Sequence, residues 1–332
     1  MTSSRHLSTL IAALSAVTLC AALASLLFGP VDLGLARIIA ALTGRGDRVA
    51  TMILFELRLP RTLLSLAVGA MLGLAGAVLQ GFLRNPLAEP AVLGTSSSAS
   101  LGAVAALYFG FAAVHPAVLP LLAILSALLS LVLLFALAGR SESALTLILA
   151  GIAVSTLAGA GISLALNLSP NPFAAMEIMT WLLGSLENRS FEHVAIALPC
   201  IAIGAGLLLW NGRALDALTL GEDGAAALGV DLRAVRLRLL LGTAIGVGGA
   251  VAVSGAIGFI GLIVPHLVRP LTDRSPSAIL IPSAIGGAAL LTLADLGVRI
   301  APTTNELKLG VVTAFLGVPV FLLHLLRERR LW

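Results

Sequence analysis

The side chains that could carry out chemistry are few in this chain of 332 residues, and none of them falls in a catalytic pattern. The single lysine, Lys308, follows Leu307, so there is no Gly-x-x-x-x-Gly-Lys-Ser/Thr phosphate loop for ATP. The five histidines are scattered, and no His-Glu-x-x-His zinc motif is present. We therefore expect this chain to have no catalytic residues and to bind no metal and no cofactor.

The composition indicates the solvent in which the chain folds. Hydrophobic residues make up 59% of the sequence and charged residues 11%, against about 25% charged residues in soluble domains. Apolar stretches long enough to cross about 30 Å of hydrocarbon as helices recur along the chain. These stretches are continuous and do not alternate with polar residues. We therefore predict an all-α polytopic membrane protein, with one transmembrane domain over residues 1–332.

The charged residues, prolines and glycines between these stretches divide them into ten predicted membrane spans. They lie near residues 7–28, 60–82, 93–113, 117–138, 144–166, 193–211, 236–256, 259–269, 278–299 and 309–326. The eighth span is too short to cross alone unless the protein thins the membrane around it. An even number of spans places both termini on one side.

The arginines indicate that this side is cytoplasmic. The C-terminal tail carries Arg327, Arg329 and Arg330, and this topology places twelve of the 20 lysines and arginines in the cytoplasm. The bias is weak because five of the other eight lie in one outer loop, between the first two spans. That concentration needs a separate explanation.

Transport driven by an ion gradient usually requires a carboxylate at mid-membrane, where a charge costs several kcal/mol. Asp295 is the main candidate, and we expect it near the outer end of the ninth span. The energy for transport is therefore better explained by a partner protein. An ion-coupled secondary transporter or a channel without an ATPase partner is the alternative interpretation.

A pattern of small residues recurs in the second and seventh predicted spans. Gly69, Gly73, Gly76, Ala77 and Val78 return 173 residues later as Gly242, Gly246, Gly249, Ala250 and Val251. Residues about 60–166 and 236–326 would then be duplicated halves with inverted topology, as in many transporters. The alternative is convergent close packing of helices rich in glycine and alanine.

Several segments carry a resemblance to a known family. They are Leu57-Arg58-Leu59-Pro60-Arg61, Arg84 to Gly94, Trp181 to Leu186, Leu220 to Val230, Gly258 to Arg269, Ala294-Asp295 with Arg299, Gly310 to Ala314 and Gly317 to Phe321. With these segments the chain resembles, nearly end to end, the FecCD/BtuC-like permease family of bacterial ABC importers for iron-siderophores, heme and vitamin B12.

The resemblance implies how the protein assembles and what it transports. It implies a homodimer in the bacterial inner membrane, in contact with lipid, and two cytoplasmic ATPase subunits that hold ATP and Mg. It also implies a periplasmic substrate-binding protein and no nucleic-acid partner. The cargo would be a ferric siderophore or heme, with cobalamin as a further option, and it would move by alternating access.

The resemblance further implies that residues about 212–235 form a cytoplasmic coupling loop that contacts the ATPase. The coupling residues would be Gly221, Glu222, Asp223, Ala225, Ala226, Leu228 and Gly229. Small side chains there suit a short helix lying in a groove of the partner. The alternative is an amphipathic surface helix.

By the same resemblance, Arg58, Arg61 and Arg299 would receive acidic side chains of the binding protein, which gives part of the explanation for the charged outer loop. Such pairs mainly guide encounter and weaken with salt. The alternative is that these arginines reach out to lipid headgroups.

The resemblance also places an inner gate at Ser141, Ser143, Ala144 and Leu145. Ser96 and Ser97 open the third span and would line the pathway, unless they only bond back to their own helix. Met176 and Met179 would rim the cavity entrance on a short outer helix, unless they pack against the sixth span. One departure is Lys308, which replaces a proline common in the family and puts the contact of that loop with the binding protein in doubt.

Overall fold

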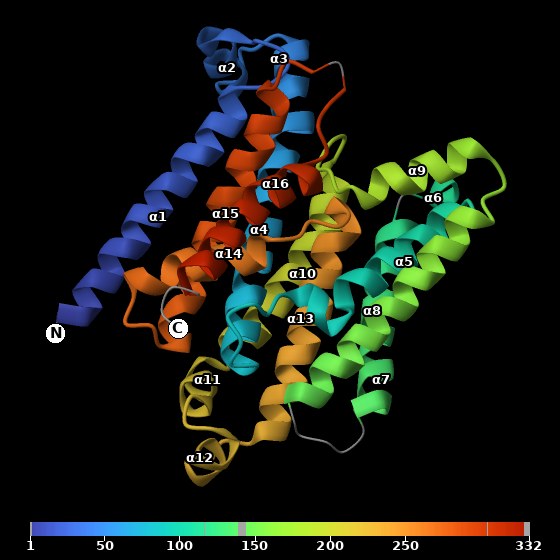
Figure 1. Ribbon diagram of the computed structural model, residues 1–332. Coiled ribbons are helices and arrows are strands. Elements are labelled where there is room, and N and C mark those ends of the chain that lie inside the picture. The colour runs from blue at the N-terminus through green and yellow to red at the C-terminus, as the bar shows by residue number, and fades with distance from the viewer. Residues whose placement is uncertain (1, 116, 139–143, 304, 329–332) are drawn as a thin grey trace.

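The computed structural model describes residues 2–115, 117–138, 144–303 and 305–328, and all regular structure in these residues is helical (Figure 1). The long helices are α1 (Thr2–Leu27), α4 (Leu59–Phe82), α5 (Thr95–Tyr108), α7 (Val118–Ala138), α8 (Ala144–Asn167), α10 (Phe191–Leu209), α13 (Leu232–Ser254), α15 (Pro276–Ile300) and α16 (Leu309–Glu328). The short helices are α2 (Gly34–Leu42), α3 (Arg48–Met52), η1 (Ile53–Arg58), η2 (Pro90–Leu93), α6 (Phe111–Val114), α9 (Pro172–Leu182), α11 (Gly212–Leu218), α12 (Glu222–Ala227), α14 (Ile260–Val268) and η3 (Arg269–Leu271).

The predicted all-α membrane fold is confirmed at the level of helix type and hydropathy. Seven helices of the described chain are long and apolar enough to cross a membrane. The predicted third and eighth spans correspond to short helices, α5 with 14 residues and α14 with nine. The number of ten spans therefore stays a prediction.

The long helices run between two ends of one bundle (Figure 1). The first helix, α1, begins at the end where α11 and α12 lie, here called the α12 end, and rises toward α2 and α3, here called the α2 end. The helix α9 lies apart from α11 and α12, at the far end of α8 (Figure 1). The two ends therefore carry different short helices.

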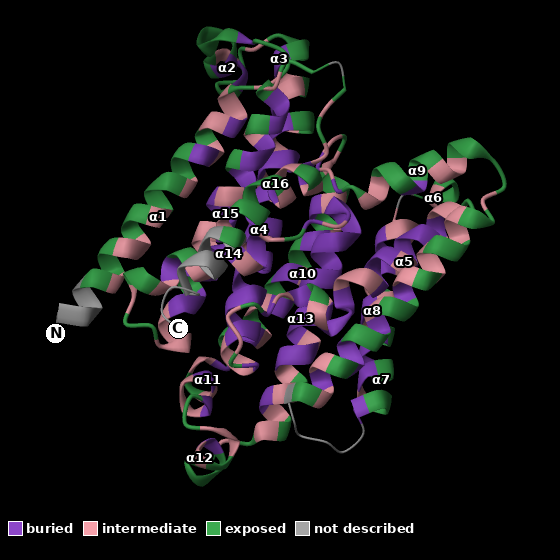
Figure 2. Cartoon of the chain, in the orientation of Figure 1, coloured by how far each residue is buried: buried purple, intermediate pink, exposed green. Residues whose placement is uncertain are grey.

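The centre of the bundle is formed by the two helices that carry the repeated glycines. Within their apolar windows, 78% of α4 and of α13 is buried, against 11% of α1 and 28% of α8 (Figure 2). A Cβ at Gly73 would overlap the carbonyl oxygen of Ser283, and one at Gly76 would overlap that of Gly261. Since lipid gives little hydrophobic drive for helix association, this close backbone contact is what stabilises the centre.

The contacts between helices occur in matching pairs. The helix α4 packs on α15, and α13 packs on α7. Likewise α5 contacts both α7 and α8, and α14 contacts both α15 and α16. If α4, α5, α7 and α8 correspond in order to α13, α14, α15 and α16, each of these contacts has its counterpart. This is what duplicated halves would produce, and the duplication itself stays a prediction.

Both sets of helices contain a break that is filled by protein. The chain between α4 and α5 passes through Gly94 at φ 77°, and the chain between α13 and α14 passes through Gly255 at φ 69° and Phe259 at φ 68°. Gly151 of α8 packs against the first break, and Gly317 of α16 packs against the ring of Phe259 in the second. Irregular backbone at membrane depth is tolerated where protein surrounds it in this way.

Candidate functional site

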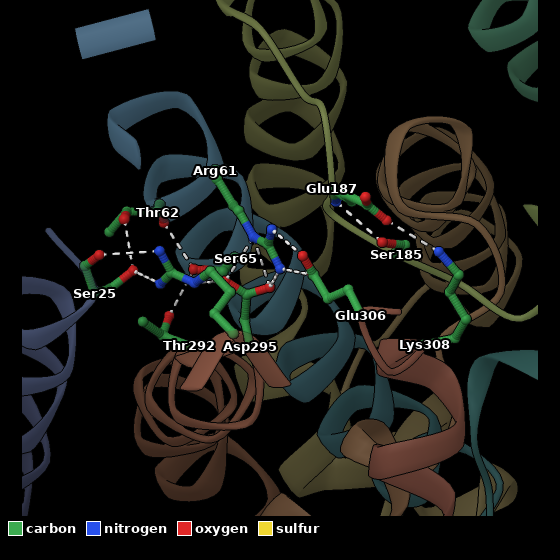
Figure 3. Close-up of polar contacts among 11 residues, drawn as sticks. Ser25, Arg61, Thr62, Ser65, Ser185, Glu187, Thr292, Asp295, Glu306 and Lys308 are labelled. Atoms are coloured by element: carbon green, nitrogen blue, oxygen red, sulfur yellow. Dashed lines mark hydrogen bonds and ion pairs between the residues drawn. The ribbon is translucent and has the colours of Figure 1, made fainter. Parts of the chain in front are cut away.

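The strongest polar cluster in the described chain lies near the α2 end and is built on two carboxylates. Arg61 donates from Nε to both oxygens of Asp295 at 3.0 Å and from Nη2 to Oδ1 at 2.7 Å (Figure 3). The same guanidinium donates through Nη1 to Oε2 of Glu306 at 3.1 Å, and its Nη2 also contacts Glu306. Arg299 forms an ion pair with Asp295 at 3.2 Å, one helical turn away. These four residues are called the ionic cluster below.

Hydroxyl groups complete the surroundings of the ionic cluster. Arg299 donates to the carbonyl oxygen of Ser25 at 3.1 Å and to its hydroxyl at 2.5 Å, and that hydroxyl contacts Thr62 at 2.7 Å. Ser65 and Thr292 form a second hydroxyl pair at 2.9 Å. The network thus joins α1, α4 and α15 (Figure 3). These bonds satisfy most of the buried donors, while Nε of Arg299 has only its ion pair with Asp295 at 3.2 Å.

Arg58 has a different set of partners. It stands at the end of η1, and its Nη1 donates to the carbonyl oxygens of Leu26 and Leu27 at 2.8 and 2.7 Å. Its Nη2 donates to the carbonyl oxygen of Val31 at 2.5 Å. The last carbonyls of a helix have no partner within the helix, so Arg58 caps the end of α1.

The structure brings the three predicted docking arginines together at the α2 end, and it also buries them. Their exposed fractions are 4% for Arg58, 8% for Arg61 and 6% for Arg299. In the single chain none of them extends from the surface as an arginine that reaches lipid headgroups would. Their role in docking stays a prediction.

A cleft of about 220 Å³ opens beside these arginines. It is called the outer cleft, and it is lined by Pro30, Val31, Ile53, Leu57, Arg58, Arg61, Glu187, Asn188, Arg189, Arg299 and Glu306. Neither Arg189 nor Glu306 was predicted as a site residue from the sequence. The only signal for Glu306 was its place in the segment before α16, next to the unusual Lys308, and nothing distinguished Arg189 from the other outer charges.

The segment before α16 is held at two points. Lys308 donates from Nζ to Oε2 of Glu187 at 3.0 Å, and Glu306 accepts from Arg61 (Figure 3). Backbone bonds then fix the start of α16, because Leu309 donates to Gly184 at 2.9 Å and Gly310 donates to Leu183 at 3.1 Å. Lys308 thus adds an ion pair to this loop.

The two helix breaks meet at a second cavity, of about 170 Å³. Its lining includes Glu89, Ser96 and Ser97 from the first break and Gly258 and Phe259 from the second. The predicted pathway serines therefore lie where the two sets of helices meet, which is where transporters built from repeats hold their cargo. Their function in the pathway stays a prediction.

The predicted coupling residues occupy α12 and the turn after it, at the α12 end. Ala225 is fully buried, while Leu220 and Leu228 are 69% and 65% exposed. Asp216 of α11 accepts from the backbone of Ser277 at 2.9 Å, which ties this segment to the first turn of α15. Gly221 at φ 92° forms the turn into α12. The result is a short helix that is anchored through Ala225 and flanked by two exposed leucines.

The remaining predicted residues are not gathered into one site. Met176 and Met179 are exposed on α9, and Leu145 is exposed at the start of α8. Ser141 and Ser143 lie outside the described residues, and Ala144 begins α8, although its side chain also lies outside the description. Among the described residues, no group of three or more His, Cys, Asp and Glu side chains could hold a metal ion.

Comparison with known proteins gives consistent matches over most of the chain. The profile of the FecCD transport family matches residues 17–327. The chain is 42% identical to the uncharacterized ABC transporter permease protein YvrB of Bacillus subtilis, over 86% of this chain and 82% of that protein. It is also 42% identical to the vitamin B12 import system permease protein BtuC of Vibrio cholerae, over 83% of each.

Solved structures agree with these sequence matches. An inward-facing conformation of a metal-chelate type ABC transporter superposes with a TM-score of 0.86 at 32% identity, covering 95% of this chain and 97% of that one. PsaBC from Streptococcus pneumoniae superposes with a TM-score of 0.54 at 17% identity, which shows a shared fold only.

Proposed function

Because this chain belongs to the FecCD transport family, whose members are permease subunits of ABC importers, we propose that it carries a bulky metal chelate across the inner membrane by alternating access. The observation that carries the proposal is the family match over residues 17–327, almost the whole chain. In such importers the ATPase is a separate subunit, so the chain itself is a transport subunit and not an enzyme.

Cobalamin is the first cargo to test. Relatives of this chain at 38 to 42% identity are named as vitamin B12 or cobalamin import permeases. Ferric siderophores and heme remain the other candidates, because the solved structure with a TM-score of 0.86 is described only as a metal-chelate type transporter. All three cargoes are larger than the 170 Å³ cavity at the helix breaks, so the pathway must widen during transport.

The helix breaks supply a reason for alternating access. Short helices that begin at mid-bundle can tilt without dragging a full membrane span, and α5 and α14 are of this kind. In the proposed cycle, Ser96 and Ser97 face the cargo, while residues 141–145 form the inner gate and Met176 and Met179 rim the outer entrance. A second copy of the chain would complete the pathway.

The two ends of the bundle would bind different partners. We assign the α12 end to the cytoplasm, where α12 would lie in a groove of each of two ATPase subunits that hold ATP and Mg. The exposed side chains of Leu220 and Leu228 supply apolar contact area there. The α2 end would face the periplasm, where the outer cleft and Arg58, Arg61 and Arg299 would receive the binding protein.

Cargo identification tests this proposal directly. The binding protein encoded next to this permease is purified, and its bound ligand is identified by mass spectrometry. Uptake of that ligand is then measured in proteoliposomes that contain the permease and its ATPase. We expect cobalamin or a ferric chelate to bind and to be taken up. Retention and uptake of a peptide, a sugar or a free ion would refute the proposed cargo class.

The structure weakens the alternative of an ion-coupled transporter. Such a transporter needs a carboxylate that can release and take up a proton or a cation. Asp295, the carboxylate expected to serve, is fully buried and paired with both Arg61 and Arg299. Both guanidinium groups already bond this buried carboxylate, so Asp295 is suited to holding helices together.

A further inference from the structure

The helix after the second break, α14, is completed by a side chain from the other set of helices. Pro265 lies inside α14 and has no N–H, so the carbonyl oxygen of Gly261, four residues earlier, lacks the donor that an uninterrupted α-helix provides. Gln80 of α4 supplies a donor here. Its Nε2 donates to the carbonyl oxygen of Gly261 at 3.2 Å and to that of Leu262 at 3.3 Å. Because Gln80 is only 2% exposed, these bonds form away from water.

The orientation of this amide is fixed from its other side. Nη2 of Arg269, which directly follows α14, donates to Oε1 of Gln80 at 2.9 Å. A guanidinium has donors only, so the amide oxygen must face Arg269 and the amide nitrogen must face the carbonyls. A glutamate here could still bond Arg269, but it would turn a carboxylate oxygen toward the carbonyls of α14. The amide therefore satisfies both sides, and the acid of the same length satisfies one.

The close approach that allows these bonds depends on Gly76. It lies one turn before Gln80 on the same face of α4, and a Cβ there would overlap the carbonyl oxygen of Gly261. Helix α4 thus meets the first turn of α14 with a glycine that admits the backbone and an amide that bonds it. Gly261 also lines the cavity of about 170 Å³ at the helix breaks. The bond from Gln80 therefore holds part of the cavity wall.

The glutamine and the proline occur together in one set of helices and are both missing from the other. At the repeat offset of 173 residues, Val253 of α13 occupies the position of Gln80. The helix α5, which would correspond to α14, contains no proline and needs no donor from outside. This is expected if the glutamine serves the proline. A glutamine that only filled space would need no proline nearby.

We propose that Gln80 is a positioning residue for transport, which replaces the hydrogen bond that Pro265 removes and fixes the first turn of α14 against α4. The inference rests on the proposed function, in which α14 tilts during alternating access. A short helix that is held at its first turn tilts about that turn, so the cavity wall at Gly261 keeps its place while the rest of α14 moves. Without this bond the first turn opens and transport slows.

Hydrogen exchange tests the bond without cargo or partners. The permease is placed in nanodiscs, and exchange of the amides in residues 260–271 is followed by mass spectrometry. Gln80→Met keeps the length of the side chain without its donor and acceptor, and we expect exchange in this segment to become about 10-fold faster. Adding Pro265→Ala gives Gly261 an N–H donor within α14. The double variant should therefore exchange within about threefold of the parent protein.

A second proline gives the matched control. Pro199 lies inside α10 and is exposed. Gln80→Met combined with Pro199→Ala gains an N–H in the wrong helix and should exchange as fast as Gln80→Met alone. Gln80→Glu should also exchange faster than the parent protein, because it keeps the bond to Arg269 and loses the donor. Rescue by Pro199→Ala, or no rescue by Pro265→Ala, would overturn the assignment.

Uptake by the same variants separates this assignment from the proposed function. ATP-driven uptake is measured in proteoliposomes with the ATPase and cargo-loaded binding protein. We expect Gln80→Met to lower the maximal rate about 10-fold with the half-saturating concentration of binding protein little changed, and Pro265→Ala to restore at least half of the rate. Exchange and uptake of Gln80→Met within twofold of the parent protein would overturn the assignment and leave the proposed function intact. No uptake by the parent protein, with exchange as expected, would refute the proposed function and confine Gln80 to a structural role.

Discussion

Arg61 on α4 and Asp295 on α15 form a buried three-bond ion pair, although 234 residues of sequence separate them. Asp295 has no solvent exposure, and Arg299 shares the same carboxylate at 3.2 Å. The pair therefore holds α4 and α15 together at the α2 end, while glycine contacts hold the same two helices along their length. Polar and small residues thus perform the packing that hydrophobic burial performs in water.

Removing Asp295 should destabilise the chain more than any surface ion pair does. Asp295→Ala leaves two buried guanidinium groups without their shared carboxylate, a change that costs about 3 to 5 kcal/mol. The measurement is thermal unfolding in detergent followed by size exclusion. Arg37→Ala is the control, because its pair with Asp47 is about half exposed and should contribute little to the stability. Similar stability of the two variants would show that Asp295 is not a structural centre.

Two glycine-to-alanine substitutions should differ in their effect on the free energy of unfolding. At Gly76 an added Cβ overlaps the carbonyl of Gly261, so Gly76→Ala should force helices apart and destabilise the chain by about 1 to 3 kcal/mol or more. At Gly297 there is open space within 4 Å, so Gly297→Ala should be neutral or stabilise α15 by up to about 1 kcal/mol. The unfolding temperatures of the two variants, compared with that of the parent protein, check both expectations. Loss of stability in Gly297→Ala would mean that its surroundings are closed.

A bulky residue on the exposed side of α12 should uncouple the transporter. Ala226 is exposed beside the buried Ala225, so Ala226→Trp leaves the anchoring of α12 intact and blocks its fit into a partner groove. We expect membrane insertion to be unchanged and ATPase activity to lose its response to cargo-loaded binding protein. Ala113→Trp, the same change at an exposed alanine of α6, is the matched control. Unchanged uptake by Ala226→Trp would argue that α12 is only a surface helix.

The two ion pairs that hold the segment before α16 should differ in strength. Glu306→Gln removes a carboxylate from the mostly buried Arg61, and we expect a loss of about 1 to 3 kcal/mol in the free energy of unfolding. Lys308→Ala removes a pair whose side chains are 22% and 38% exposed, and we expect a loss below about 1 kcal/mol. Chemical unfolding of both variants gives the comparison. A larger loss for Lys308→Ala would make that residue the main anchor of the segment.

The positions of most long helices could be predicted from the sequence, because hydropathy and the length of an apolar stretch are local properties of the chain. The ninth span was predicted at residues 278–299, and α15 runs from Pro276 to Ile300. The third span was predicted too long, because η2 and the left-handed Gly94 occupy its first residues and Gly110 ends the helix region early. Such breaks depend on tertiary contacts, here the packing of Gly151 against the chain at Val92, which a hydropathy pattern does not contain.

The site was predicted less completely, for a physical reason. The family resemblance implied that Arg58, Arg61 and Arg299 face a partner, but sequence alone does not show whether a charge is already paired. Glu306 lies 245 residues from Arg61 along the chain, and only the fold brings them into contact. Arg58, Arg61 and Arg299 all have partners inside the chain, and only the donors and acceptors that the fold brings together reveal this.

Identifying the source of energy for transport tests most directly whether this chain is the permease subunit of an ATP-driven importer. Proteoliposomes containing the permease and its ATPase are supplied with cargo-loaded binding protein outside, and cargo uptake is measured with and without ATP inside and with a protonophore. We predict uptake that requires both ATP and the binding protein and that is unaffected by the protonophore. Uptake that proceeds without the ATPase and collapses with the proton gradient would contradict the account.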